Sequence, residues 1–165
     1  MKAKIIAVAG AVGLAVGGLV AYRQTPPPPA PSDPCQSGLV CAVNPAVTQA
    51  TIRATICVSG WTATIRPSTS YTSQLKTQQM LQLHLLGTGT DYEEDHRLPL
   101  ELGGHPSDPH NLTPELRRSG GGKAEIKDHD ENAAKASVCS GSKTLAQAQA
   151  EFIAKWLKPW PGYRA

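Results

Sequence analysis

The stretch TPPPPAPSDP, at residues 25–34, constrains the fold most because it holds six prolines in ten residues. Proline fixes φ and has no backbone N–H, so this stretch can join neither a helix nor the ladder of a sheet. It predicts an extended polyproline spacer. We therefore assign residues 24–34 to a linker and expect the folded domain to occupy residues 35–165.

Before the linker, Lys2 and Lys4 precede an uninterrupted apolar run over residues 5–22. Such a run after positive residues is typical of a secretory signal peptide or of a single membrane anchor, and both interpretations of residues 1–23 stay open. An uncleaved anchor is slightly favoured because Leu19 stands where a small residue would precede a cleavage site. Either interpretation predicts export. The domain would then be membrane-anchored, with this helix as its membrane contact, or periplasmic or extracellular.

Charge is unevenly distributed along the exported part. Residues 91–131 hold 11 acidic against five basic residues, whereas the rest of the chain after residue 23 holds eight basic against two acidic ones. This pattern excludes a protein coated with positive charge for nucleic acid. An acidic segment suits a cation site and a basic surrounding suits a polyanionic substrate, although ordinary surface variation gives the same counts.

The four cysteines contain no C-x-x-C pair, which argues against a zinc knuckle. An even number of cysteines in an exported chain indicates two disulfides, for which three pairings exist. We predict a short local bridge, Cys35–Cys41, and a bridge between the two halves of the domain, Cys57–Cys139.

The pattern of apolar and turn residues predicts a small α+β domain. The expected elements are a strand–turn–strand over residues 48–67, a helix over 70–87, short strands over 97–104 and near Leu112, and helices over 123–138 and about 144–158. Ser73 or Thr72 is expected to begin the first helix and Gly87 to end it. Thr144 is expected to begin the last helix, whose apolar face would carry Leu145, Phe152, Ile153, Trp156 and Leu157.

One group of residues has the composition of a catalytic site. In DYEEDHRLPLELGG, residues 91–104, Asp95 and His96 close a run of acids, and Asn111 follows after a loop. The helix expected over residues 123–138 then carries Lys127, Asp128 and Glu131. The order D-H…P-L…G-G…N-L before a helix resembles the ββα-metal (HNH) nucleases. It is similar above all to exported bacterial proteins whose HNH-like domain continues into K-D-x-x-E and a cysteine. The resemblance covers about residues 47–157, and the ββα motif would lie at about 92–138.

The resemblance implies specific roles for these residues. His96 would be the general base that activates water, and Asn111 would fix the orientation of His96. Asp95 would bind a divalent metal ion, with Mg²⁺ or Mn²⁺ expected from oxygen ligands and Zn²⁺ an alternative. The second ligand would be Asp128 or Glu131 in preference to His129, because HNH proteins usually place a histidine sooner after the asparagine. Lys127 and Arg97 would contact the substrate.

Two functions follow from this interpretation. The first is a metal-dependent endonuclease that hydrolyses DNA outside the cytoplasm. The second is a non-catalytic binding or structural module of the cell envelope that keeps the HNH-like fold. The sequence leaves oligomeric state and substrate sequence open.

Overall fold

The computed structural model describes Cys35, residues 41–117 and residues 123–157. All of them belong to the second of two compact units, residues 31–165. The predicted segment 1–23 and the linker 24–34 lie outside the described residues. Within the described part of the chain, no helix is long and apolar enough to cross a membrane.

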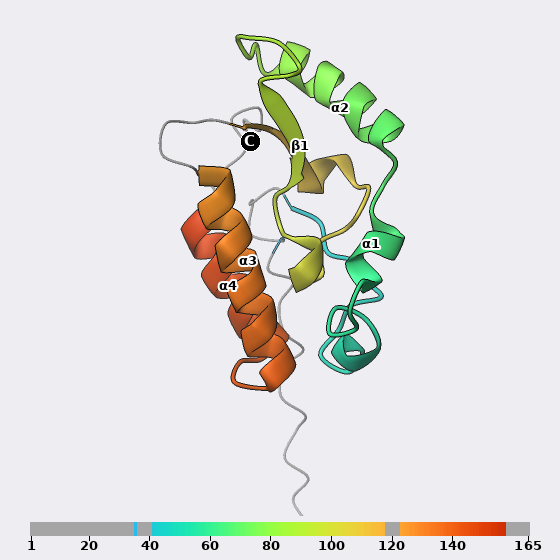
Figure 1. Cartoon of the computed structure of the whole chain (residues 1–165), viewed down its shortest axis with the longest axis vertical. Coiled ribbons are helices and arrows are strands. Elements are labelled where there is room, and N and C mark those ends of the chain that lie inside the picture. Colours follow the sequence, from blue (N-terminus) through green and yellow to red (C-terminus); the bar gives the residue numbers. More distant parts are fainter. Residues whose placement is uncertain (1–34, 36–40, 118–122, 158–165) are drawn as a thin grey trace, which may run out of the picture. The chain divides into compact units, whose positions relative to one another are not determined.

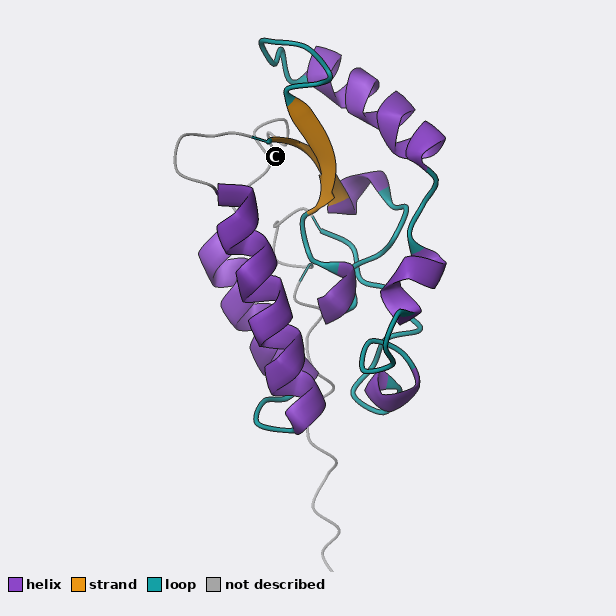
Figure 2. Cartoon of the chain, viewed as in Figure 1, coloured by secondary structure: helices purple, strands orange, loops and turns teal. Residues whose placement is uncertain are grey.

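An antiparallel hairpin lies at the centre of the arrangement. Strand β1 (Tyr92–His96) pairs with β2 (Leu112–Leu116), with His96 opposite Leu112. Helix α2 (Thr69–Gln82) contacts both strands, and α3 (Lys123–Ser140) packs along α4 (Leu145–Trp156). Figure 1 shows β1 between α2 and the α3–α4 pair. Among the described residues, helices outweigh one small sheet (Figure 2), and the predicted mixed α+β class is confirmed.

The helices follow local signals. Helix α4 begins after Thr144, as predicted, with a complete capping box between Thr144 and Gln147. Its predicted apolar face is correct, since Leu145, Phe152 and Ile153 are buried and Trp156 and Leu157 pack against them. Helix α3 also lies where it was predicted.

The bounds of α2 differ from the prediction. Its N-cap is Ser68, whose hydroxyl accepts a hydrogen bond from Tyr71 N–H, instead of Ser73 or Thr72. It ends at Gln82 instead of near Gly87, because His84 takes a positive φ of 51° that no helix continues.

Two predicted strand segments are wrong. Residues 48–67 contain the 3₁₀-helix η1 (Ile52–Ala54) and the short helix α1 (Trp61–Ile65), with Gly60 at φ 77° between them. Threonine hydroxyls there bond to nearby carbonyls, as Thr55 does to Thr51 O and Thr64 to Trp61 O, which competes with a sheet ladder. Residues 97–104 form the 3₁₀-helix η2 (Leu100–Leu102) and a turn instead of a strand. A further 3₁₀-helix, η3 (Pro109–Asn111), leads into β2.

The core lies between α4, the end of α3, η2 and the segment before α1. It gathers side chains that are almost inaccessible to solvent, and Gln149 Nε2 donates to Leu102 O at 2.8 Å within it. Its most deeply buried members are Ile56, Leu98, Leu102 and Val138.

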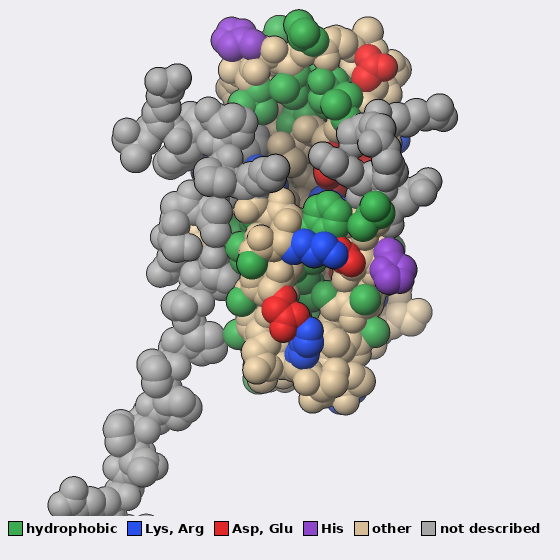
Figure 3. All heavy atoms as spheres, turned by 90° about the vertical axis from the view of Figure 1, so that its left-hand side faces the viewer, with side chains coloured by type: hydrophobic (Ala, Val, Ile, Leu, Met, Phe, Trp, Pro, Cys, Tyr) green, Lys and Arg blue, Asp and Glu red, His purple; other side chains and the backbone are tan. Residues whose placement is uncertain are grey.

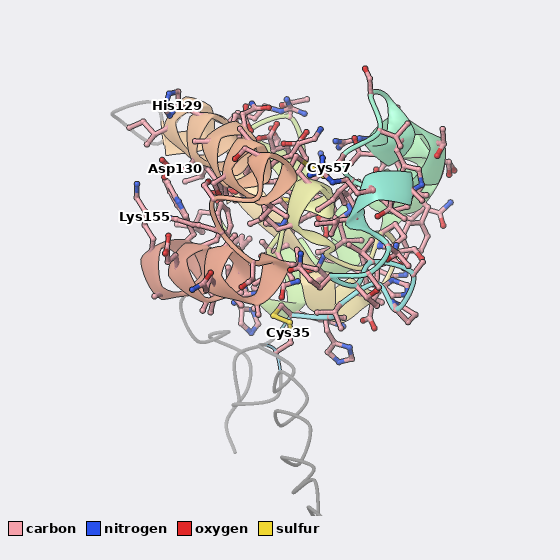
Figure 4. All side chains as sticks on the ribbon, turned by 90° about the horizontal axis from the view of Figure 1, so that it is seen from below. Cys35, Cys57, His129, Asp130 and Lys155 are labelled. Atoms are coloured by element: carbon pink, nitrogen blue, oxygen red, sulfur yellow. A yellow bond between two sulfur atoms is a disulfide. The ribbon has the colours of Figure 1, made fainter. Side chains whose placement is uncertain are left out.

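Helices α3 and α4 are also joined by polar contacts. Asp130 on α3 accepts hydrogen bonds from Trp156 Nε1 at 2.8 Å and pairs with Lys155 at 2.5 Å. Asp130 and Lys155 point toward each other across the two helices in Figure 4. Figure 3 shows acidic and basic side chains next to each other on one face of the molecule. Lys143, which precedes α4, forms a further ion pair with Glu151 within that helix.

Both predicted disulfides are present, Cys35–Cys41 and Cys57–Cys139. The second ties the segment before α1 to the end of α3, across a sequence separation of 82 residues. The first closes a separation of six residues.

We predict that replacing Cys57 and Cys139 together by serine lowers the free energy of unfolding by about 4 kcal/mol, because a long loop loses its constraint in the unfolded chain. Replacing Cys35 and Cys41 should cost roughly half as much, since the loop is short. Urea unfolding of both double variants measures the difference. Equal losses would contradict the assignment of the long bridge as the main covalent constraint.

Candidate functional site

Strand β1 presents its acids and His96 to two different sides. Successive side chains of a strand alternate, so Tyr92, Glu94 and His96 share one face and Glu93 and Asp95 share the other. The first face lies toward α2, where Lys76 Nζ donates to Tyr92 O at 2.9 Å. The second face lies toward α3. Asp95 and His96 are therefore neighbours in sequence with separate surroundings.

His96 is buried, with 5% of its surface exposed. Its Nε2 lies 2.9 Å from Pro106 O, and because a carbonyl only accepts, Nε2 carries the proton. Burial lowers the pKa of His96, although the Pro106 bond and Asp95 oppose this and Arg66 and Lys127 add to it. The ring is therefore neutral at neutral pH, and Nδ1 holds the lone pair.

Asn111 holds the loop that supplies the Pro106 carbonyl. Its side chain is fully buried, accepts from Leu98 N at 2.9 Å and donates to Leu98 O and His105 O at 3.0 Å. The resemblance implied that Asn111 fixes the orientation of His96 through a hydrogen bond to its ring or its backbone. Instead it bonds to Leu98 and to His105, the residue before Pro106. Asn111 thus acts on His96 through the loop.

The two glycines of the motif, Gly103 and Gly104, follow η2 and lead into this loop. Gly103 has a φ of 79°, as expected for a tight turn. At Gly104 a Cβ atom would lie 1.8 Å from Leu98 O and 2.7 Å from Asn111 Nδ2. Gly104 is required because the backbone of Leu98 and the Asn111 amide occupy the space of a side chain.

Lys127 is the central group on the other face of the hairpin. Its side chain is 6% exposed, and Nζ forms an ion pair with Asp95. Nζ also donates to Glu115 Oε2 and to His96 O, each at 3.1 Å, and lies 3.9 Å from Glu131 Oε1. The ammonium group of Lys127 thereby links helix α3 to both strands.

The ionisation of this cluster follows from burial and from that ammonium. Burial opposes the charge of Asp95, but the Lys127 charge and hydrogen bond hold the pKa of that carboxyl below its ordinary value. Burial raises the pKa of Glu115, and it raises that of Glu131 to about 8, with Lys127 opposing both shifts. Burial also disfavours the charge of Lys127, but Asp95 and Glu115 raise its pKa. The lysine is charged.

Two other residues predicted for the site lie away from the cluster. Asp128 and His129 are exposed, and His129 points outward from α3 in Figure 4. Arg97 is partly buried, and burial lowers its pKa while Glu115 opposes the shift. The structure therefore brings together Asp95, Glu131 and Lys127 but places Asp128 and His129 on the outer surface. Lys127 directs its N–H groups to protein oxygens and not to the surface, where a substrate phosphate would lie.

The predicted divalent ion can be tested against these donors. The carboxylates of Asp95, Glu115 and Glu131 are oxygen ligands of the type that Mg²⁺ and Mn²⁺ prefer. They converge on a buried, positively charged ammonium, which repels a second cation at that point. No group of three or more His, Cys, Asp or Glu side chains within the described ranges is arranged to hold a metal. The arrangement with Lys127 in place does not fit the ion.

Sequence reasoning missed Glu115, Glu94 and Pro106. Glu115 could have been found from the hairpin register, because Asp95 pairs with Thr113 and Glu115 lies two residues further along the same face. Glu94 belongs to the noted acidic run, but only the fold shows that both its oxygens are buried with no hydrogen-bond partner among the described residues. The contact of His96 with Pro106 could not be predicted from residue types, because it uses the backbone carbonyl of Pro106.

Comparison with protein-family models, with curated proteins and with solved structures finds no significant match to this chain.

We predict that Asn111→Ala lowers the free energy of unfolding by at least about 2 kcal/mol, because buried backbone groups of Leu98 and His105 lose their partner. Gly104→Ala should destabilise as well, through contact with Leu98 O. Urea unfolding measures both. Asn132→Ala is the matched control, since exposed Asn132 bonds only to Asp128 O among described contacts, and it should leave stability nearly unchanged.

The raised pKa of Glu94 leads us to expect that the stability of the fold depends on pH. Burial raises its pKa to about 8, with Lys76 opposing, from an ordinary value of 4.5. Because the folded-state pKa is the higher one, its contribution to stability is complete below about pH 4.5 and is lost as pH rises to about 8. Glu94→Gln, which cannot ionise, should reduce the fall in melting temperature across this window. Glu93→Gln, on the opposite strand face, should keep the wild-type slope, and an unchanged slope in Glu94→Gln would contradict the assignment.

Proposed function

We propose that this chain is an endonuclease that hydrolyses DNA phosphodiester bonds, with His96 as the general base. The observation that carries the proposal is the state of His96. It is a neutral imidazole whose Nε2 proton is held by Pro106 O, which leaves Nδ1 as the basic atom. Because the protonated nitrogen is fixed, the ring orientation and the base are both defined. The D-H…N-L motif supports the same ββα arrangement.

The reaction uses this base in one step. Nδ1 of His96 takes a proton from water as the water oxygen attacks phosphorus, the bond to the leaving oxygen breaks, and that oxygen takes up a proton from solvent. The carbonyl of Pro106 stabilises the positive charge that forms on the ring. Arg66 is exposed after α1 and acts electrostatically on His96, so this guanidinium is available to a substrate phosphate.

The predicted divalent metal ion does not fit the site with Lys127 in place, and no step is assigned to it. Two of the predicted ligands, Asp95 and Glu131, pair with Lys127 instead. Removal of metal by a chelator tests whether cleavage needs the ion. Export by the N-terminal segment, membrane attachment and action on DNA outside the cytoplasm are parts of the proposal, supported by the sequence alone.

The second candidate is a non-catalytic binding or structural module of the cell envelope. One observation favours it: the acidic cluster is neutralised within the protein, since Lys127 bonds to Asp95, Glu115 and His96 O. A module that kept the ββα fold only for its stability would retain these contacts and Asn111. It would show no turnover with any metal ion.

We predict that the full chain with its disulfides formed nicks plasmid DNA, and that His96→Ala lowers the rate by about 10²-fold or more through loss of the base. His129→Ala, on the outer surface, is the matched control and should cleave like the wild type. Near-ultraviolet circular dichroism checks that each variant is folded. Parallel reactions with Mg²⁺, Mn²⁺, Zn²⁺ or a chelator measure metal dependence. Folded His96→Ala that cleaves normally overturns the mechanism, and a wild type inactive in all conditions favours the module.

A further inference from the structure

The acidic cluster of the hairpin is already organised around one positive charge. Its oxygen atoms come from three elements: Asp95 and the His96 carbonyl from β1, Glu115 from β2, and Glu131 from α3. They converge on Nζ of Lys127. No other contact in the described part of the chain brings so many carboxylates to one atom.

These oxygens occupy all the N–H donors of the ammonium group. An ammonium has three N–H donors, and three acceptors bond to Nζ: Asp95 Oδ2, Glu115 Oε2 and His96 O. The fourth oxygen, from Glu131, lies at ion-pair distance. With its side chain 6% exposed, Lys127 has neither a donor nor a surface left for a ligand from outside.

The same oxygens are of the chemical type that a hard divalent ion binds, although with Lys127 among them the carboxylates of the described residues are not arranged as a metal-binding group. Carboxylates and a backbone carbonyl are the ligands that Mg²⁺, Mn²⁺ and Ca²⁺ take in proteins. A divalent ion at this point would stand beside a buried ammonium, and the repulsion between two cations in a poorly solvated site opposes its entry. Without the ammonium, the carboxylates would stand close together with no cation to neutralise them.

We propose that the Lys127 ammonium is the resident cation of this cluster, and that a divalent ion binds here only when the ammonium is removed. Lys127 then takes the structural place that the resemblance to metal nucleases would give to an ion. The proposal concerns the cluster alone and does not depend on the proposed hydrolysis.

The test uses Mn²⁺ as the probe and the full chain with its disulfides formed. Lys127→Met removes the charge and keeps much of the side-chain volume. Without metal, this variant should melt at a lower temperature than the wild type, because its carboxylates have lost their partner. Mn²⁺ at about 100 times its Kd should raise the melting temperature by roughly 5–10 °C. Electron paramagnetic resonance should detect one tightly bound Mn²⁺ per chain, which the further change Asp95→Asn removes.

Lys135→Met is the matched control. Lys135 lies on the same helix, is partly buried, and pairs with a carboxylate, Glu101, at 2.9 Å. Only one carboxylate is involved, so Mn²⁺ should neither bind tightly to this variant nor restore its melting temperature. The wild type should also show no Mn²⁺ site that Asp95→Asn removes.

Two results would overturn the proposal. One is a wild type that binds Mn²⁺ at a site lost in Asp95→Asn. The other is a folded Lys127→Met that binds no more Mn²⁺ than Lys135→Met. Where Lys127→Met does not fold even with Mn²⁺ present, the wild-type titration with and without Asp95→Asn decides the matter by itself. Nuclease activity enters none of these measurements, so failure of the proposed function is recognised separately.

Discussion

The buried ammonium of Lys127 is the interaction on which the rest of the arrangement depends. It joins α3 to both strands through Asp95, Glu115 and the His96 carbonyl. A buried charge is costly unless it is paired and hydrogen-bonded, so each of these acceptors stabilises the ammonium in its buried position. It also fixes the backbone at His96 from the side opposite to that residue's ring. The position of the ring thus depends on a contact made by the neighbouring helix.

The other side of His96 depends on a loop without regular structure. Asn111 closes this loop on Leu98 and His105, and Gly104 allows the close approach. The Pro106 carbonyl then holds the imidazole. Strand alternation separates the two environments: a charged cluster faces α3, and a neutral histidine faces α2 together with Glu94, whose carboxylate oxygens are buried. Adjacent residues in one short strand can therefore hold a charge and a neutral base a few ångströms apart.

Prediction from sequence succeeded where structure is local. Thr144 and its capping box, the apolar face of α4 and the extent of α3 depend on residues a few positions apart. It failed for residues 48–67 and 97–104, whose β-branched and alternating residues resemble strands. A strand needs a partner, and the only ladder that forms in the described part of the chain joins β1 to β2. Threonine hydroxyls and the tight turn at Gly103 then favoured short helical turns.

The sequence by itself determined the candidate residues His96, Asp95 and Asn111, the helices that follow them, and two disulfides whose pairing the fold confirms. Only the tertiary structure decided which groups meet. In it Asp128 and His129 are exposed, and Lys127 is buried among the carboxylates. Asn111 bonds to the loop instead of to the imidazole. Spacing along a helix shows which residues share a face, but the neighbour of that face, and with it the charge balance of a buried cluster, is set by packing between elements distant in sequence.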